Sequence, residues 1–207
     1  MTLSEIKEYF DLNMRPCVLF ESVDSTNTYL KKNRHAPGTV AIALSQSAGH
    51  GQYGRVFESP ESGLYMSLCV RFVPDFPITL AAAHAVTDAL TDLFSLSCGV
   101  KWINDIIADG RKLCGILAES VFGGGEPLTV VGFGMNLKKG GLSREVSEIA
   151  ISLEELLGTE LPDDALARLA LKISENLETE LSGTREAVIK KYRARCLSEI
   201  PDEIEGL

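Results

Sequence analysis

The sequence predicts an α+β domain in which a mixed, mostly antiparallel sheet carries helices packed against one face. Two turn signals, Asp109-Gly110 and Gly123-Gly124-Gly125, join three apolar segments between residues 100 and 136, and strands linked by hairpins run antiparallel. From residue 152 onward the apolar residues recur at helical spacing instead. With 207 residues, 45% of them hydrophobic, the chain is long enough to bury one core.

The N-terminal part is expected to begin with a short helix over residues 4–11 and a buried strand over residues 17–23. Asp24-Ser25-Thr26-Asn27 then offers four successive N-cap residues ahead of a second helix. A strand that delivers side-chain hydroxyls to a helix start makes a good small polar site, although a plain helix cap is the commoner outcome. A second buried strand over residues 39–46 leads directly into a glycine-rich loop.

This glycine-rich loop, Gly49-His50-Gly51-Gln52-Tyr53-Gly54-Arg55-Val56-Phe57, suits a backbone that wraps closely around an anion. Glycine permits positive φ and removes the Cβ that would hold a ligand away, and Arg55 adds planar charged donors that match phosphate. The glycine spacing also fits the dinucleotide-binding motif G-x-G-x-x-G, but that motif needs a helix to begin at the loop. Pro60 and Gly63 exclude a helix there. Two interpretations remain: a ligand-binding loop between two strands, or an ordinary surface loop.

The strand after the loop is expected over residues 64–72, and a long helix over about residues 79–97. The apolar segment 100–108 is expected to form one strand, which returns through the Asp109-Gly110 turn into a strand over residues 112–119. A further strand over residues 128–136 would complete the sheet.

The remainder is expected to be helical. Ser152-Leu153-Glu154-Glu155 has capping-box spacing, and Gly158 suits a helix end. Residues 164–181 place apolar side chains on one face, and a last helix carries Val188, Ile189 and Tyr192.

Composition excludes several classes of protein. A net charge of −9 argues against a nucleic-acid partner, which would require a basic face. No apolar run is long enough for a membrane span, and the first residues lack a signal-peptide pattern. The cysteines are scattered and show no metal-ligand spacing with the three histidines. They are therefore expected to be buried free thiols in a reducing cytoplasm: Cys17, Cys69, Cys98, Cys114 and Cys196.

Polar residues interrupt the apolar strands around the Asp109-Gly110 turn. Lys101, Asn104 and Asp105 lie close together in the sequence, and Lys112 opens the returning strand. Two interpretations stay open. The lysine and the aspartate form a surface ion pair worth less than about 1 kcal/mol, or Asp105 holds Mg²⁺ while Lys112 meets a phosphate or carboxylate.

Five motifs in this order, over roughly residues 17–197, are together similar to the catalytic domain of biotin protein ligases, also called biotin–[acetyl-CoA-carboxylase] ligases. The resemblance implies a fold of the class II aminoacyl-tRNA-synthetase-like, biotin/lipoate ligase type, with a catalytic domain over residues 1–197 and an acidic tail over residues 198–207. The motifs are Asp24-Ser25-Thr26-Asn27; Gln46 with Gly49-x-Gly51-x-x-Gly54-Arg55-x-Phe57; Lys101-Trp102-x-Asn104-Asp105; Arg111-Lys112-x-x-Gly115-Ile116-Leu117; and Gly132-x-Gly134-x-Asn136.

The resemblance implies a two-step reaction. Biotin and ATP form biotinyl-5′-adenylate and pyrophosphate, and a lysine of a biotin carboxyl carrier protein then attacks the adenylate. The family pattern assigns the ureido head to residues of the first two motifs, the closing loop to the glycines, and the apolar slot to Gly115 and Leu117. The implied biotin-binding set is Ser25, Thr26, Asn27, Gln46, Gly49, His50, Gly51, Gln52, Lys112, Gly115 and Leu117.

The same resemblance assigns the catalytic roles. Lys112 would polarise the biotin carboxylate and then the acyl-phosphate, and Arg55 would neutralise phosphate charge. Phe57 would form a wall for the adenylate, and Asp105 would bind Mg²⁺. The implied ATP- or adenylate-binding set is Arg55, Phe57, Lys101, Asn104 and Asn136.

Several departures from the family pattern bear on function. His50 and Gln52 replace two arginines of the usual loop, which implies looser retention of the adenylate, and Ile103 stands where proline is usual. We expect no N-terminal DNA-binding domain and no complete C-terminal SH3-like barrel, and edge-to-edge pairing of two copies stays open. Two other functions also stay open: ligation of lipoate or another acyl acid, and binding of biotin or its adenylate without transfer.

Overall fold

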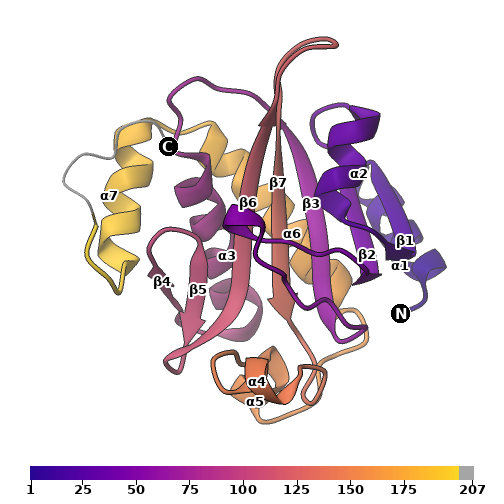
Figure 1. Ribbon diagram of the computed structural model, residues 1–207, viewed down its shortest axis with the longest axis vertical. Helices are drawn as coiled ribbons and strands as arrows, with labels where there is room; N and C mark the ends of the chain where they lie inside the picture. Colours follow the sequence, from indigo (N-terminus) through magenta and orange to yellow (C-terminus); the bar gives the residue numbers. More distant parts are fainter. Residues whose placement is uncertain (201–207) are drawn as a thin grey trace.

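The computed structural model describes residues 1–200; residues 201–207, which include most of the expected acidic tail, lie outside the described part. One seven-stranded sheet runs through the protein in the order β1-β2-β3-β7-β6-β5-β4 (Figure 1). Only β1 and β2 are parallel, and every other neighbouring pair is antiparallel, as the sequence predicts. The strands are β1 Cys17–Val23, β2 Val40–Gln46, β3 Gly63–Arg71, β4 Gly99–Lys101, β5 Asp105–Ala108, β6 Arg111–Val121 and β7 Leu128–Asn136.

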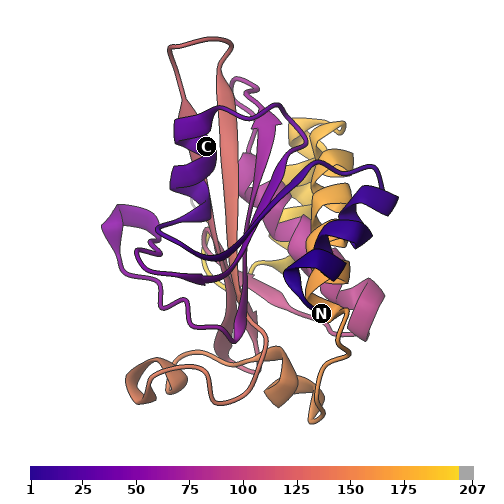
Figure 2. The same cartoon turned by 90° about the vertical axis from the view of Figure 1, so that its right-hand side faces the viewer.

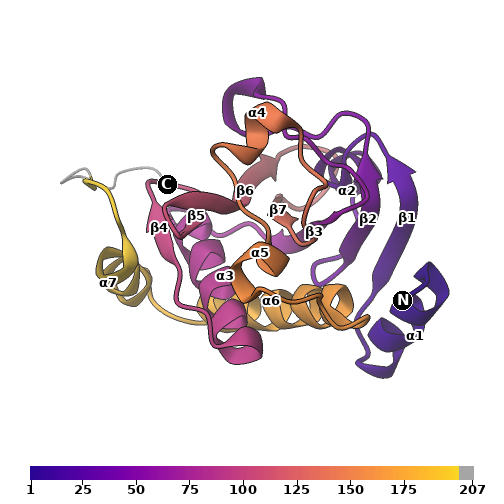
Figure 3. The same ribbon diagram turned by 90° about the horizontal axis from the view of Figure 1, so that it is seen from below.

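Most helices cover one face of this sheet, as expected, but α2 lies on the other face and the short α4 lies on the same side as α2 (Figures 2 and 3). Successive side chains of β3 point to opposite faces of the sheet, and both sets are buried. Leu64, Met66 and Leu68 belong to the main core, whereas Cys69 packs with Leu30 of α2 in a second, smaller core. The helices are α1 Leu3–Leu12, α2 Thr26–Asn33, α3 Ile78–Phe94, α4 Arg144–Ser147, α5 Leu153–Leu157, α6 Ala165–Leu181 and α7 Arg185–Arg195, with a 3₁₀ turn, η1, at Gln52–Gly54.

The prediction of one strand over residues 100–108 is wrong. The segment forms two short antiparallel strands, β4 and β5, in which Lys101 lies opposite Asp105. The turn between them is held by α7, because the Tyr192 hydroxyl donates to the Ile103 carbonyl at 3.1 Å and the Trp102 ring meets the Tyr192 ring edge-to-face. An apolar run cannot reveal such a turn, since the partner is about 90 residues away.

The two expected hairpin connections are confirmed. Asp109 and Gly110 both have positive φ, 48° and 70°, as a two-residue hairpin loop requires. The three glycines 123–125 also have positive φ, and they connect β6 to β7. The turn chemistry was therefore visible in the sequence even where the strand boundaries were not.

The two edges of the sheet differ. Residues 196–198 lie along β4: Leu197 donates its N–H to the Val100 carbonyl, and Trp102 donates its N–H to the Ser198 hydroxyl at 2.8 Å. Beyond β1, no described strand continues the sheet. Between residues 1 and 200, no helix is long and apolar enough to cross a membrane.

All five cysteines are free, as expected. Cys17, Cys69, Cys98 and Cys114 are buried, whereas Cys196 is only partly buried. Burial raises the pKa of Cys69 and Cys98 to about 11, so these thiols behave as small apolar side chains.

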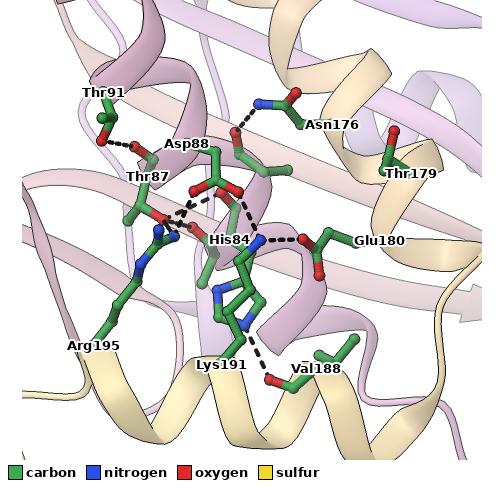
Figure 4. Close-up of polar contacts among 12 residues, drawn as sticks. His84, Thr87, Asp88, Thr91, Asn176, Thr179, Glu180, Val188, Lys191 and Arg195 are labelled. Atoms are coloured by element: carbon green, nitrogen blue, oxygen red, sulfur yellow. Dashed lines mark hydrogen bonds and ion pairs between the residues drawn. The ribbon is translucent and has the colours of Figure 1, made fainter. Parts of the chain in front are cut away.

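A polar network attaches α7 to α3 and α6 (Figure 4). Asp88 accepts from Lys191 and from Arg195, each at 2.7 Å, and Lys191 also pairs with Glu180. Burial alone would raise the pKa of Asp88, but these two cations hold it below its usual value. Beside them, the fully buried His84 ring has its Nε2 at 3.0 Å from the Val188 carbonyl.

We expect His84 to make the fold less stable in mild acid. Burial lowers its pKa below the usual 6.5, and its buried Nδ1 has no hydrogen-bond partner in the described chain, so protonation would add an unpaired N–H. The unfolded chain then binds more protons than the folded chain below about pH 6.5, and the free energy of unfolding should fall by about 1 kcal/mol from pH 7.5 to 5.5.

Urea unfolding at the two pH values measures this difference. His84→Gln retains a donor for the Val188 carbonyl but does not titrate, so its stability should vary less across the same interval. Equal pH dependence in the two proteins would assign the effect to other groups.

Candidate functional site

A cavity of about 340 Å³ lies on the α2 face of the sheet. Its floor contains glycine at three positions that share one face of β6 and β7: Gly115 lies opposite Gly134, and Gly132 lies opposite Leu117. A Cβ at Gly134 would come within 2.6 Å of the Phe57 ring. Glycine inside a strand is typical of close approach by another group, and here it leaves the floor of the cavity flat.

The start of α2 forms the polar end of the cavity. Ser25 is the N-cap, and its hydroxyl accepts from the Thr28 N–H at 3.4 Å. The Thr26 N–H donates to Gln46 Oε1 at 2.9 Å, which brings the end of β2 against the helix start. Ser25, Thr26, Asn27 and Gln46 all line the cavity, and the first three are almost fully buried.

The glycine-rich loop forms one wall. It is a narrow hairpin in which Gly51 donates to the Arg55 carbonyl and Phe57 donates to the Gly49 carbonyl. Its tip is open to solvent, since Tyr53 is 91% exposed, and the Arg55 guanidinium stacks at 5.9 Å from the Tyr53 ring. The loop is therefore hydrogen-bonded at its base and exposed to solvent at its tip.

Two glycines of this loop are expected to respond differently to substitution. A Cβ at Gly49 would lie 2.5 Å from Ser59 Oγ and 2.6 Å from the Phe57 carbonyl oxygen, whereas a Cβ at Gly51 would meet nothing closer than 3.9 Å. Gly51 also has φ −109°, which any residue adopts. Gly49→Ala should lower the free energy of unfolding by about 1–3 kcal/mol, and Gly51→Ala by less than about 0.5 kcal/mol.

Chemical denaturation of the two variants measures this contrast, and equal stabilities would mean that the base of the loop adapts freely. A Cβ at position 51 fits the present loop conformation, so an effect of this substitution on ligand binding would have to arise in a more closed state.

Charged groups gather at the opposite end of the cavity. Lys112 Nζ lies 2.6 Å from Asp105 Oδ1, and it lies 5.7 Å from the centre of the Phe57 ring. The Asn104 amide donates to the Ile116 carbonyl at 2.7 Å, which fixes the turn beside them. Within residues 1–200, Asp105 is the only carboxylate that lines the cavity. A lysine and a carboxylate thus meet at the end of the cavity opposite the start of α2.

Three of the predicted site residues lie outside the cavity lining. Gly49 is at the base of the loop, and Lys101 is exposed on β4 opposite Asp105. Asn136 is buried and donates to the carbonyls of Lys112 and Ile151, at 3.4 and 3.3 Å. The lining does include all the others: Ser25, Thr26, Asn27, Gln46, His50, Gly51, Gln52, Arg55, Phe57, Asn104, Asp105, Lys112, Gly115 and Leu117.

Comparison with known proteins identifies the family of this chain. Residues 19–136 match the model of the Biotin/lipoate A/B protein ligase family, which is more than half of the 207 residues. The chain belongs to this family.

Curated relatives include two kinds of biotin ligase. The biotin–[acetyl-CoA-carboxylase] ligase of Mycobacterium tuberculosis (strain ATCC 25618 / H37Rv) is 36% identical over 174 residues, which are 78% of this chain and 62% of that protein. The bifunctional ligase/repressor BirA of Bacillus subtilis (strain 168) is 32% identical over 153 residues, 69% of this chain and 46% of that protein. The chain therefore spans less than two thirds of the length of either relative.

Solved structures of the family share the fold. A biotin protein ligase from Aquifex aeolicus, in complex with biotin and ATP, matches with a TM-score of 0.77 at 27% identity, over 88% of this chain and 78% of that one. The Leishmania major biotin protein ligase in complex with biotinyl-5-AMP matches with a TM-score of 0.70 at 25% identity, over 92% and 86%. These likenesses confirm the expected fold class and the resemblance to biotin protein ligases.

Several residues around the site escaped the sequence-based prediction. Val56 and Ile149 line the cavity, and so does Gly132, which stands in the motif Gly132-x-Gly134-x-Asn136 but had no assigned role. Ser67 and Glu119 contact the Asn27 side chain. Strand alternation was a usable signal for one of them, because residue 119 shares a face with residues 115 and 117. Ile149 gave no such signal, since it lies in an irregular segment that reaches the cavity through backbone bonds to Lys112.

Proposed function

We propose that this chain is a biotin–[acetyl-CoA-carboxylase] ligase, which activates biotin with ATP and transfers it to a lysine of a biotin carboxyl carrier protein. One observation carries the proposal. A single cavity has hydrogen-bonding groups at Thr26 and Gln46, a glycine floor, and a lysine, Lys112, at the opposite end. This order matches biotin, which has a ureido head, an apolar middle and a carboxylate. The names of the relatives and the ligands in the Aquifex and Leishmania complexes support it.

Biotin would lie along β6, with its ureido head at Ser25, Thr26, Asn27 and Gln46. Its apolar portion would rest on Gly115 and Leu117, and Gly49, His50, Gly51 and Gln52 of the loop would close over it. Thr26 and Gln46 also favour biotin over lipoate, because a dithiolane ring has no N–H or carbonyl to pair with them. Buried polar groups that stay unpaired disfavour a wrong ligand strongly.

In the first step, a carboxylate oxygen of biotin attacks the α-phosphorus of ATP, and the bond to the leaving pyrophosphate breaks. The reaction brings two anions together, so cations must offset their repulsion. Lys112 would contact the carboxylate and the phosphorus-bound oxygens, and Arg55 would approach the phosphates as the loop closes. Phe57 would form an apolar wall, and Lys101, Asn104 and Asn136 would support the nucleotide.

The polar residues fit a magnesium ion that arrives with the nucleotide. Within residues 1–200, no three His, Cys, Asp or Glu residues gather closely enough to hold a metal ion by themselves. Magnesium, however, commonly keeps several waters and takes only one or two carboxylates together with substrate phosphates. Asp105 would be that carboxylate, exchanging its contact with Lys112, and the bound ion would neutralise phosphate charge.

In the second step, the ε-amine of the carrier lysine attacks the acyl carbon of the adenylate, AMP leaves, and an amide forms. A closed loop would exclude the water that otherwise hydrolyses the adenylate. The free thiols are in line with a cytoplasmic reaction, where the carrier protein would be the macromolecular partner. We assign no nucleic-acid partner, because the chain is strongly acidic.

Transfer of labelled biotin to an isolated carrier-protein domain tests the proposal, with ATP and Mg²⁺ present and pyrophosphate release followed in the same reaction. Transfer together with pyrophosphate establishes the ligase. Pyrophosphate without transfer would restrict the activity to adenylation. Biotin binding without either signal would contradict the proposal and favour a binding module, and transfer of lipoate in preference to biotin would favour the lipoate alternative.

A further inference from the structure

The Asn27 amide is held within the protein, because both of its N–H groups donate to protein oxygens and its oxygen accepts from Ser67. Asn27 Nδ2 donates to Glu119 Oε2 at 2.8 Å and to the Leu117 carbonyl at 3.2 Å. Its Oδ1 lies 2.6 Å from the hydroxyl oxygen of Ser67, which is fully buried. The amide therefore connects Glu119, behind the cavity, to a chain of hydroxyl groups.

The shortest contact among these hydroxyl groups decides where their protons lie. The Ser67 hydroxyl has one proton and two near oxygens, Asn27 Oδ1 at 2.6 Å and Thr26 Oγ1 at 2.7 Å. Since Oδ1 has no proton, the 2.6 Å contact needs the Ser67 proton, and the contact between Ser67 and Thr26 then needs the Thr26 proton. The Thr26 hydroxyl therefore donates to Ser67 at 2.7 Å and not to Gln46 Oε1, which lies farther away at 3.2 Å, and its lone pairs remain for the cavity.

Gln46 has the complementary orientation. Its Oε1 accepts from the Thr26 N–H at 2.9 Å, and its Nε2 lies 3.1 Å from Ser59 Oγ. Nε2 carries two protons, so one N–H remains after the bond to Ser59. Thr26 and Gln46, which both line the polar end of the cavity, thus offer one acceptor and one donor, which is the complement of the N–H and C=O groups of a cyclic urea.

Glu119 determines the direction in which the hydrogen bonds through Asn27, Ser67 and Thr26 are donated. A carboxylate only accepts, so the nitrogen of Asn27 must face it. Burial alone would raise the pKa of Glu119, but hydrogen bonds from Lys31 and Asn27 hold it below its usual value, and the group stays ionised near neutral pH. Its other oxygen, Oε1, accepts from Lys31 Nζ at 2.5 Å. His50 Nε2 lies 3.8 Å from Oε2, beyond hydrogen-bond distance.

We propose that Glu119 is a positioning residue for biotin, which acts through Asn27 and Ser67 to make the Thr26 hydroxyl an acceptor for a ureido N–H. The inference rests on the proposed function and deepens it, because it names the group that makes the site selective for a cyclic urea. Glu119 itself does not line the cavity. It lies seven residues beyond Lys112 on β6, or about 20 Å along an extended strand, and so acts on binding and not on the activated carboxylate.

Glu119→Gln tests the direction of these hydrogen bonds, because glutamine has nearly the same shape as glutamate. Lys31 has only protons to donate, so the carbonyl of the introduced glutamine turns toward Lys31 and its NH₂ group faces Asn27. Asn27 must then flip or lose a bond, and Thr26 would present a proton where an acceptor is needed. The dissociation constant for biotin, measured by calorimetry, should rise by at least about tenfold, and KM for biotin should rise while kcat changes little.

Removing Lys31 supplies the decisive control. In Glu119→Gln/Lys31→Met, the glutamine carbonyl is free to face Asn27, so the affinity for biotin should return to within about threefold of the unmodified protein; Lys31→Met alone should bind normally. A thermal melt of each variant confirms folding.

Three results would overturn the inference: normal binding by Glu119→Gln, a double variant as weak as Glu119→Gln, or weak binding by Lys31→Met alone. The second and third would mean that loss of the ion pair, not the proton direction, weakens binding. Failure of the unmodified protein to bind biotin would instead remove the proposed function itself.

Discussion

Lys112→Ala should slow the formation of biotinyl-adenylate by at least about 10²–10³-fold, the usual effect of removing a group that stabilises charge developing in a transition state. Pyrophosphate release in a single turnover with ATP and biotin measures this rate. The affinity for biotin should fall much less, because the ureido contacts lie at the other end of the cavity. The effect is therefore expected in the chemical step.

The geometry around Lys112 explains why the loss should be specific. The lysine side chain lies across Gly115, where a Cβ would come within 3.1 Å of Cε and Nζ. Its backbone is held independently, because its N–H donates to the Ile149 carbonyl and its carbonyl accepts from Ile151. Alanine keeps these bonds. The loss of the half-exposed ion pair with Asp105 should cost less than about 1 kcal/mol of stability.

Two further variants delimit this prediction. Lys190→Ala removes an exposed lysine of α7 and should adenylate biotin at the normal rate. Lys112→Arg retains the charge but replaces a compact ammonium by a planar guanidinium, so it should restore only part of the rate. Normal adenylation by Lys112→Ala would remove this lysine from the mechanism. If the affinity for biotin fell by the same factor as the rate, Lys112 would stabilise bound biotin and not specifically the transition state.

The sequence predicted most of the strands because their signals are local. Asp109-Gly110 determines a turn by itself, and apolar residues with turn residues at both ends mark β1, β2 and β3 to within one residue. The turn at Trp102-Ile103-Asn104 was not predicted, because it depends on a contact with Tyr192 of α7. The position of α2 on the opposite face was equally hidden, since a short helix with one buried leucine has little amphipathic pattern.

In the candidate site, too, local features were predicted and contacts between distant residues were not. The sequence motifs identified the groups that face the cavity, such as Thr26 and Lys112, whose assigned roles stay predictions. They did not show which side chains are already occupied. Asn27 is satisfied by Glu119, Leu117 and Ser67, and Asn136 donates to two backbone carbonyls. Such bonds join residues up to about 90 positions apart, and only the folded arrangement reveals them.

Gly132→Ala should abolish measurable binding of biotin, with a dissociation constant raised by at least about 10²-fold through the loss of ordered polar contacts. A Cβ at this position would lie 2.3 Å from Asn27 Oδ1 and 2.9 Å from its Cγ. Asn27 cannot move aside easily, because Glu119 and Leu117 hold its nitrogen and Ser67 holds its oxygen. The methyl group must therefore displace the start of α2, which carries Ser25 and Thr26.

The same substitution should also lower the free energy of unfolding by about 1–3 kcal/mol, as overpacking of a buried site does. A control must therefore destabilise the protein without touching the cavity. Val131→Ala suits this purpose, because Val131 is the next residue of β7 and its side chain belongs to the core on the helix face. It should cost about 1–3 kcal/mol and leave the affinity for biotin unchanged at a temperature where both variants are folded.

Calorimetry with biotin and thermal melts of the two variants separate a local effect from a global one. Weak binding by Gly132→Ala together with normal binding by Val131→Ala would show that the space beside Gly132 is needed for the ligand end of α2. Equal weakening in both would mean that binding follows stability alone. Normal binding by a folded Gly132→Ala would show that Asn27 yields, and the tight contact between β7 and α2 would then have no part in recognition of biotin.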